Sequence, residues 1–155
     1  MIVPMSIDYA AQIAGWEYEN KYSIYSFHQD DDTIEELMNG EYYAYLEQHN
    51  ELSGYFCFGK SARIPTVEND AYALEILDVG LGMNPTLCGK GYGYSFVKSG
   101  LDFAQASFDI KQLRLTVAEF NTRAIRVYEK IGFQHSASVT HRIAKKKFII
   151  MTYTY

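Results

Sequence analysis

The sequence predicts a single α/β or α+β domain in which helices flank a sheet of mixed strand pairing. Three patterns lead to this prediction: an aromatic hairpin in the first half, a long apolar run in the middle, and alternating helix and strand periodicities after it. With 155 residues, 48% of them hydrophobic, the chain can bury one sizeable core and is too short for two ordinary domains. We therefore expect one domain over residues 1–155.

The first forty residues have a helical and aromatic character. Ser6 or Asp8 can cap a helix whose apolar residues continue to Trp16. The acidic run at residues 30–32 can neutralise the positive end of a second, short helix, which Gly40 closes.

The middle of the chain favours strands. Glu41–Gln48 and Leu52–Gly59 are rich in aromatic residues and predict an antiparallel hairpin. The apolar run Ala71–Met83 fits a buried central strand best.

Helix and strand periodicities alternate beyond this run. From Gly91 onward, apolar residues follow the spacing of one helical face. Residues 111–118 alternate apolar side chains with polar ones, Arg114 among the latter, which is the period of a half-buried strand. The remaining elements are expected in the order of a helix capped by Asn121 and ended by Gly132, a strand at 133–139 and a strand at 147–155.

Charge and composition restrict the partners. A net charge of −5 argues against nucleic acid, which requires a basic surface, and makes a cationic partner electrostatically easier. No basic leader precedes an apolar run at the N-terminus, and no window approaches the roughly 18 to 20 apolar residues of a membrane span. We expect a cytoplasmic protein without a membrane partner.

Cysteines and histidines show no metal pattern. Cys57 and Cys88 lack the CxxC spacing and are too few for a disulfide framework, so both are expected as reduced thiols. The four histidines never occur at i, i+4 with a carboxylate between them, so no metal site is expected.

The segment Leu81–Gly93 (LGMNPTLCGKGYG) carries the most chemical information, because it joins a buried strand to a glycine-rich turn and the start of a helix. Amides at a helix N-terminus and close approach at glycine favour an anion, and Lys90 adds a charge suited to phosphate. The spacing excludes a P-loop, since Asn84 and Gly91 stand where glycine and Ser/Thr are needed. It also excludes the dinucleotide fingerprint, because Gly93 comes one residue early.

Residues 88–93 (CGKGYG) resemble the Q/R-x-x-G-x-G/A signature of the GNAT superfamily of N-acetyltransferases. About thirty residues further on, Leu113–Phe133 (LRLTVAEFNTRAIRVYEKIGF) is similar to the family's strand, N-x-x-A helix, Tyr and G-F sequence. The two motifs occur in the family's order and cover about residues 71–133. The resemblance implies a central mixed, mostly antiparallel sheet and an acetyltransferase that uses acetyl-CoA, without a metal.

The resemblance also implies which residues hold coenzyme A. The backbone of Leu81 and Met83 would pair with the pantetheine arm, the turn amides would hold the pyrophosphate, and Asn121 would contact the cofactor. Cys88 replaces the Gln or Arg that the signature prefers, which removes a side-chain phosphate contact. The candidate cofactor-binding residues are Leu81, Met83, Cys88, Gly89, Lys90, Gly91, Tyr92, Gly93 and Asn121.

Acetyl transfer needs a free amine and a proton for the leaving thiolate. Glu75 and Asp78 are the only acidic residues in the predicted strand 71–83, and both are candidate bases, with Glu75 favoured and water as a further possibility. Tyr128 matches the family's tyrosine near the acetyl-CoA sulfur and is the candidate acid.

Several alternatives stay open. The expected activity is direct transfer to a primary amine on a small molecule or peptide, cationic by the charge argument. The chain could instead be an acyl-CoA-binding sensor without turnover, or an interaction module whose turn binds nothing. Glu75 could be a solvated or paired carboxylate, Tyr128 a core residue, and Cys88 a nucleophile with a lowered thiol pKa. The acceptor and the oligomeric state, a homodimer included, are not identified by the sequence.

Overall fold

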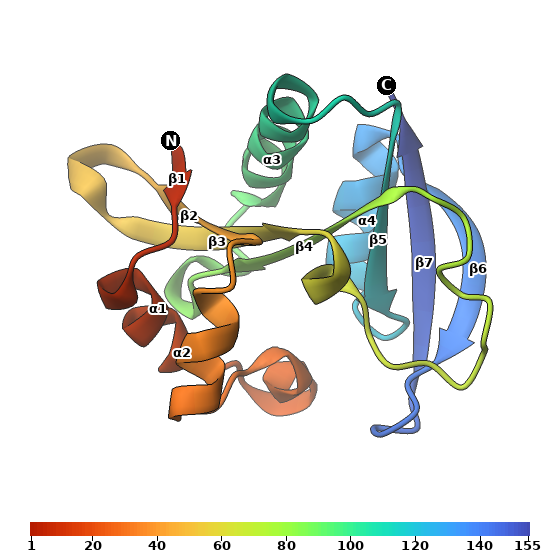
Figure 1. Ribbon diagram of the computed structural model, residues 1–155, viewed down its shortest axis with the longest axis horizontal. Helices are drawn as coiled ribbons and strands as arrows, with labels where there is room; N and C mark the ends of the chain where they lie inside the picture. The colour runs from red at the N-terminus through yellow and green to blue at the C-terminus, as the bar shows by residue number, and fades with distance from the viewer. The chain divides into compact units, whose positions relative to one another are not determined.

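The computed structural model describes residues 1–155, and its seven strands form one mixed sheet with the order β1-β2-β3-β4-β5-β7-β6 (Figure 1). The pairs β1–β2, β2–β3, β5–β7 and β6–β7 are antiparallel, while β4 and β5 are parallel. The mixed, mostly antiparallel sheet with helices beside it confirms the predicted fold class. The chain forms two compact units, residues 1–57 with 81–90 and residues 58–80 with 91–155.

The first unit contains the N-terminal helices and hairpin. Its elements are β1 (Ile2–Pro4), α1 (Ile7–Ala14), a 3₁₀ turn (Asn20–Tyr25), α2 (Asp31–Leu37), β2 (Tyr42–Leu46), nearly all of β3 (Leu52–Phe58) and the last residues of β4 (Leu77–Met83). Helices α1 and α2 pack against each other.

Side-chain caps start both helices, as the sequence predicted. The Ser6 hydroxyl accepts a hydrogen bond from the Tyr9 amide at 3.2 Å, and Asp30 Oδ1 accepts one from the Thr33 amide at 2.8 Å. The bond from the Thr33 amide lowers the pKa of the exposed Asp30 carboxyl. These caps satisfy amides that the helices themselves leave unpaired.

The strand β1 is absent from the sequence-based prediction. It has three residues and pairs with β2, with Val3 opposite Ala44. A segment this short that ends in a proline shows no strand period, and only a ready-made neighbouring edge makes it a strand.

Aromatic side chains pack around Tyr55 in the first unit. The Tyr55 ring lies 6.3, 5.8 and 6.1 Å from the rings of Trp16, Phe27 and Tyr42, measured between centroids. A Cβ added at Gly82 would lie 2.3 Å from the Tyr55 ring, so the ring sits directly on the β4 backbone. Only glycine fits beneath it.

The second unit holds the longer helices. Its elements are the first residues of β4, α3 (Gly93–Ser107), β5 (Gln112–Ala118), α4 (Thr122–Ile131), β6 (Gln134–Thr140) and β7 (Lys147–Thr154). The buried residues of α3 include Phe96, Val97, Leu101 and Ala104, the face that the sequence predicted. Helices α3 and α4 pack against each other, and β5 pairs with β7 along its whole length.

The central strand is shorter than predicted. The structure begins β4 at Leu77, and residues 71–76 form turns and irregular backbone. In this segment the Tyr72 hydroxyl lies 2.7 Å from Thr116 Oγ1 and accepts a hydrogen bond from the Ile64 amide at 3.2 Å. The apolar composition of residues 71–76 therefore does not extend the strand.

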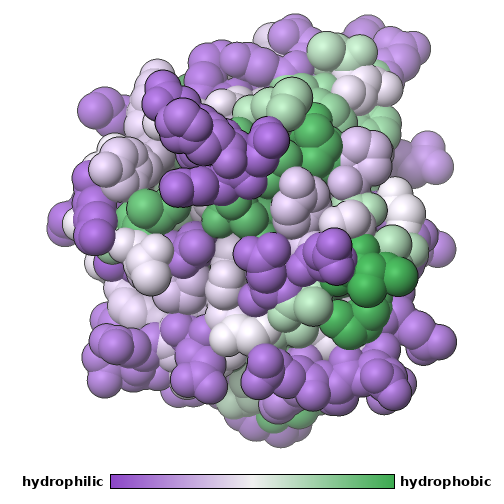
Figure 2. Space-filling view, turned by 90° about the vertical axis from the view of Figure 1, so that its left-hand side faces the viewer, coloured by the Kyte–Doolittle hydropathy of each residue, from purple (hydrophilic) through white to green (hydrophobic).

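Large apolar side chains are exposed at separate points of the chain, among them Ile7, Val67, Leu74 and Ile143. The face shown in Figure 2 is mostly hydrophilic, with small apolar areas between polar ones. None of the helices combines the length and the apolar character needed to cross a bilayer.

Candidate functional site

The Asn84 side chain fixes the turn that follows β4. Asn84 Oδ1 accepts hydrogen bonds from the Thr86 amide at 3.1 Å and the Thr86 hydroxyl at 2.9 Å. Asn84 Nδ2 donates to the Leu52 carbonyl at 3.3 Å, and the Asn84 amide donates to the Ser53 carbonyl at 2.9 Å. These bonds tie the end of β4 to the start of β3, and so they set where the glycine-rich turn begins.

The glycine-rich turn uses conformations that favour glycine. Gly89 and Gly91 have φ of 74° and 87°, in the left-handed region. A Cβ at Gly91 would meet nothing within 4 Å, so the space beside its backbone is open. Backbone amides in such turns can face an anion with no side chain in the way. This geometry fits the pyrophosphate that the sequence assigned to the turn.

Helix α3 begins without a side-chain cap. Its N-cap is Tyr92, which makes no capping hydrogen bond, and Lys90 is exposed just before it. The first amides of this 15-residue helix therefore keep the partial positive charge that attracts anions. A Cβ at Gly93 would lie 3.4 Å from Val127 Cγ2 on α4, so this residue faces the neighbouring helix.

The carbonyl of Met83 is already occupied within the protein. The Tyr18 hydroxyl donates to it at 2.6 Å, and the Cys88 thiol lies 3.8 Å away. Burial, and secondarily the nearby Cys88 thiol, raise the pKa of Tyr18, so the hydroxyl keeps its proton and remains a donor. A carbonyl oxygen has two lone pairs, and here the Tyr18 hydroxyl and the Cys88 thiol are directed at them. The amide is therefore the backbone group of Met83 to consider for pairing with a cofactor.

The two candidate bases lie in different environments. Asp78 is 2% exposed, and both of its oxygens accept charge-assisted bonds: Oδ1 from Arg114 Nε at 2.6 Å, and Oδ2 from Arg114 Nη2 at 2.9 Å and Arg63 Nε at 2.8 Å. Glu75 is exposed and lies two residues before β4, which corrects its predicted position within the strand. Of the two carboxylates, only that of Glu75 is open to an incoming group.

Arg114 also holds the backbone on both sides of Glu75. Its Nη1 donates to the Leu74 carbonyl at 3.1 Å, and its Nη2 donates to the Ile76 carbonyl at 3.3 Å. The guanidinium lies 5.0 Å from the centre of the Tyr72 ring, within the range of a cation–π contact. The exposed Glu75 carboxylate therefore belongs to an irregular segment whose backbone Arg114 holds in place.

The sequence placed Arg114 on the polar side of a half-buried strand, and the structure corrects this, because Arg114 is 3% exposed. Alternation fails here since β5 is a central strand, with buried residues on both of its faces. The available signal was Asp78, an acidic residue in an apolar run, which requires a partner when buried.

As predicted, Asn121 caps α4 and Tyr128 lies on this helix. Asn121 Oδ1 accepts a hydrogen bond from the Ala124 amide at 3.2 Å, so this side chain caps the helix. Tyr128 is 7% exposed, and its ring packs edge-on against Phe133 with 5.8 Å between centroids. The packing fixes the direction of the Tyr128 ring. The roles of Asn121 toward a cofactor and of Tyr128 as an acid stay predictions.

A comparison with protein families and curated proteins gives two matches. The model of the acetyltransferase (GNAT) family matches residues 8–133. Mycothiol acetyltransferase from Salinispora tropica is 34% identical over 64 residues, which are 41% of this chain and 21% of that protein. The match thus spans about a fifth of the length of this curated relative.

Solved structures share the fold along the whole chain. A GNAT-family acetyltransferase from Bacillus anthracis superposes with a TM-score of 0.73 at 17% identity, covering 99% of this chain and 93% of the other. Spermidine N-acetyltransferase from Vibrio cholerae, described as dodecameric, gives 0.70 at 15% identity over 99% and 92%. AAC(6')-Ib in complex with paromomycin and acetyl-CoA gives 0.71 at 18% identity over 99% and 92%. At these identities the likeness shows the fold.

Proposed function

Because the chain belongs to the acetyltransferase (GNAT) family, we propose that it transfers an acetyl group from acetyl-CoA directly to a primary amine. The observation that carries this proposal is the turn at Gly89 and Gly91, with its left-handed glycines, open space and uncapped following helix. A turn that served only to reverse the chain would not need open space beside Gly91 and an uncapped helix after it.

The resemblance to the family assigns the residues that hold the cofactor around this turn. The amides from Gly89 to Gly93, Tyr92 included, hold the pyrophosphate, and Lys90 adds a positive charge. The Cys88 amide, which the sequence also assigned to the pyrophosphate, instead donates to the Pro85 carbonyl at 3.3 Å. The backbone of Leu81 and the amide of Met83 hold the pantetheine arm, and Asn121 contributes a polar contact. Bound acetyl-CoA supplies the acetyl group as an activated thioester.

Two residues handle the protons. Glu75 accepts a proton from the incoming ammonium, directly or through water, since an amine attacks only with a free lone pair. Tyr128 donates a proton to the departing thiolate. Arg114 supports the base by fixing the carbonyls of Leu74 and Ile76 on either side of it. Asp78 serves this arrangement as the partner of Arg114.

The acceptor in this proposal is a cationic amine. The net charge of −5 draws cations toward the protein, and the names of two structural neighbours refer to spermidine and to a complex with paromomycin. A neutral or anionic best acceptor, with a rate insensitive to salt, would contradict this part.

The test is thiol release from acetyl-CoA in the presence of a panel of amines. Wild type should acetylate at least one amine, and Glu75→Gln should lower kcat/KM by about 10²-fold or more, because general-base assistance typically contributes about 10² to 10⁴. Glu68→Gln is no control, since Glu68 accepts from the Thr140 amide. The matched control is Glu129→Gln, at an exposed position of α4, and this variant should keep the wild-type rate.

A binding measurement distinguishes an acetyltransferase from a sensor that binds acyl-CoA without turnover. A protein that binds coenzyme A but releases no thiol with any amine would be a sensor on the same fold. A protein whose melting temperature coenzyme A does not raise would lack the cofactor site altogether, because a ligand specific for the native state must stabilise it.

A further inference from the structure

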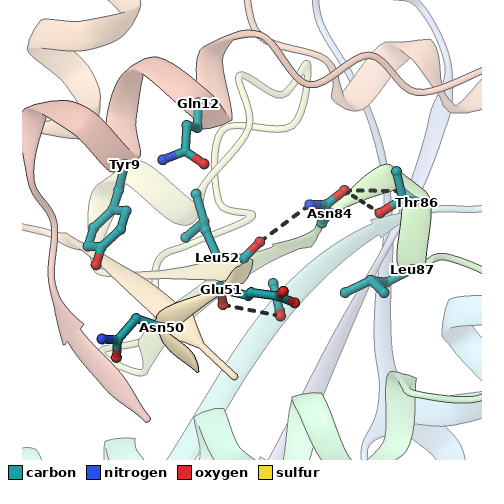
Figure 3. A pocket seen from close by; sticks show the side chains of 9 residues that line it. Tyr9, Gln12, Asn50, Glu51, Leu52, Asn84, Thr86 and Leu87 are labelled. Atoms are coloured by element: carbon teal, nitrogen blue, oxygen red, sulfur yellow. Dashed lines mark hydrogen bonds between the residues drawn. The ribbon is translucent and has the colours of Figure 1, made fainter. Parts of the chain in front are cut away.

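The first unit contains a cavity of about 350 Å³ (Figure 3). None of its lining residues is assigned to acetyl transfer. This volume lies in the lower part of the range of small-molecule sites, roughly 300 to 1,000 Å³. Its walls come from α1, the loop between β2 and β3, the start of β3, and the turn after β4. The lining residues are Tyr9, Gln12, Asn50, Glu51, Leu52, Ser53, Asn84, Thr86 and Leu87.

The lining divides into a fixed wall and a set of unpaired groups. Asn84 and Thr86 bond to each other and belong to the wall. In contrast, the side chains of Tyr9, Gln12, Asn50 and Glu51 have no hydrogen-bond partner in the protein. In Figure 3 the Tyr9 ring extends from α1 toward Asn50 of the hairpin loop. Polar groups from two separate elements are therefore available to a ligand at one place.

The charge of the lining selects a cation. Glu51 is the one charged side chain in it, and the cavity has no lysine, arginine or histidine. A single carboxylate balances a single positive charge, and the attraction between the two is stronger near a protein surface than in bulk water. A ligand with several ammonium groups would leave most of them without a counter-charge.

The uncharged groups select hydroxyls. The carboxamides of Gln12 and Asn50 each carry donors and an acceptor, which matches hydroxyl groups that both donate and accept. The Tyr9 ring and the Leu87 side chain provide apolar surface for the C–H faces of a sugar ring. Gln12 and Asn50 are exposed, and a chain of methylenes would displace water from their carboxamides without offering a hydrogen bond in return.

We propose that this cavity binds a small hydroxylated monoamine of the amino-sugar class. Its ammonium group pairs with Glu51, and its hydroxyl groups bond to Gln12 and Asn50. The site is separate from the residues proposed for acetyl transfer, and the proposal does not depend on that activity.

The probe is D-glucosamine, titrated into the whole protein without acetyl-CoA and followed by NMR chemical shifts. Shifts should be centred on Gln12, Asn50 and Glu51, with saturation at millimolar concentrations. Glu51→Gln should weaken binding about tenfold, because it removes the charge and keeps the shape. The matched control is Glu47→Gln, which removes the same charge from the same loop at a residue outside the lining, and it should bind as wild type does.

Two further ligands make the test selective. Glucose lacks the ammonium and should bind at least about tenfold more weakly than glucosamine. Spermidine lacks the hydroxyls and should also bind more weakly. The proposal is overturned by an absence of glucosamine shifts at about 10 mM, a concentration at which even a Kd of about 1 mM gives near saturation. Tighter binding of glucose or spermidine overturns it too, as does equal glucosamine binding by Glu51→Gln.

Discussion

Arg114 and Asp78 form a two-point ion pair inside the second unit, with Nε 2.6 Å from Oδ1 and Nη2 2.9 Å from Oδ2. Both side chains are almost fully buried. Removing one partner of such a pair leaves a buried charge without compensation, which costs far more than the pair contributes.

Arg114→Met should therefore lower the free energy of unfolding by about 3 kcal/mol or more, even though Arg63 stays beside Asp78. Urea denaturation measures this. Arg126→Met, which removes an exposed arginine from α4, should change it by less than about 0.5 kcal/mol. The double variant Asp78→Asn/Arg114→Met should be more stable than the sum of its single changes predicts. Strict additivity would show that the two residues are not coupled.

Gly91→Val should weaken coenzyme A binding by a few kcal/mol, because its side chain enters the open space beside the turn amides. Gly40 provides a matched control, since its φ is 93° and a Cβ there also meets nothing within 4 Å. Both valine variants should lose about 1 to 2 kcal/mol of stability from the strained backbone. Calorimetry with coenzyme A should show lost affinity only for Gly91→Val, and equal affinities would refute the pyrophosphate site.

Tyr128→Phe should lower kcat by about 10² to 10⁴ with little change in cofactor affinity, because the ring and its packing on Phe133 remain and only the hydroxyl is removed. Single-turnover kinetics at saturating acetyl-CoA measure the chemical step. Tyr94→Phe, at an exposed position of α3, should leave it unchanged. A Tyr128→Phe rate within about twofold of wild type would make Tyr128 a packing residue.

The turn between β6 and β7 should loosen in acid. His141 Nδ1 accepts hydrogen bonds from the Ile143 and Ala144 amides at 3.2 and 3.1 Å, which requires the neutral ring. Burial, and then the Arg142 charge, lower the pKa of His141 from its ordinary value of 6.5. The neutral form is thus favoured in the fold, so its contribution is present above pH 6.5 and is lost as the pH falls through the folded-state pKa.

An NMR titration of His141 checks this and should give a pKa below 6.5. The Ile143 and Ala144 amides should exchange faster at about pH 5 than at about pH 7.5, after correction for intrinsic rates. In His141→Phe the difference between the two pH values should disappear. A His141 pKa above 6.5 would mean that the charged ring is the stabilised form.

Local patterns predicted the elements whose signal is contained in a few residues. Asn121 and Gly132 bound α4 because a cap and a left-handed glycine act within one turn of helix. The glycine-rich turn was predictable for the same reason. Arg114 was not, because its burial depends on Asp78, which is 36 residues away in the chain. The early start assigned to the central strand has a similar origin, since the contacts of residues 71–76 are with distant residues such as Thr116.

The contact between Gly82 and Tyr55 constrains how this protein can vary among its descendants. A side chain at position 82 would overlap the Tyr55 ring, and a smaller residue at position 55 alone would leave a cavity beside Trp16 and Phe27. Either change on its own is unfavourable, whereas both together can be tolerated. Substitutions at these two positions should therefore be inherited as a pair, with a side chain at 82 found only where the residue at 55 is small.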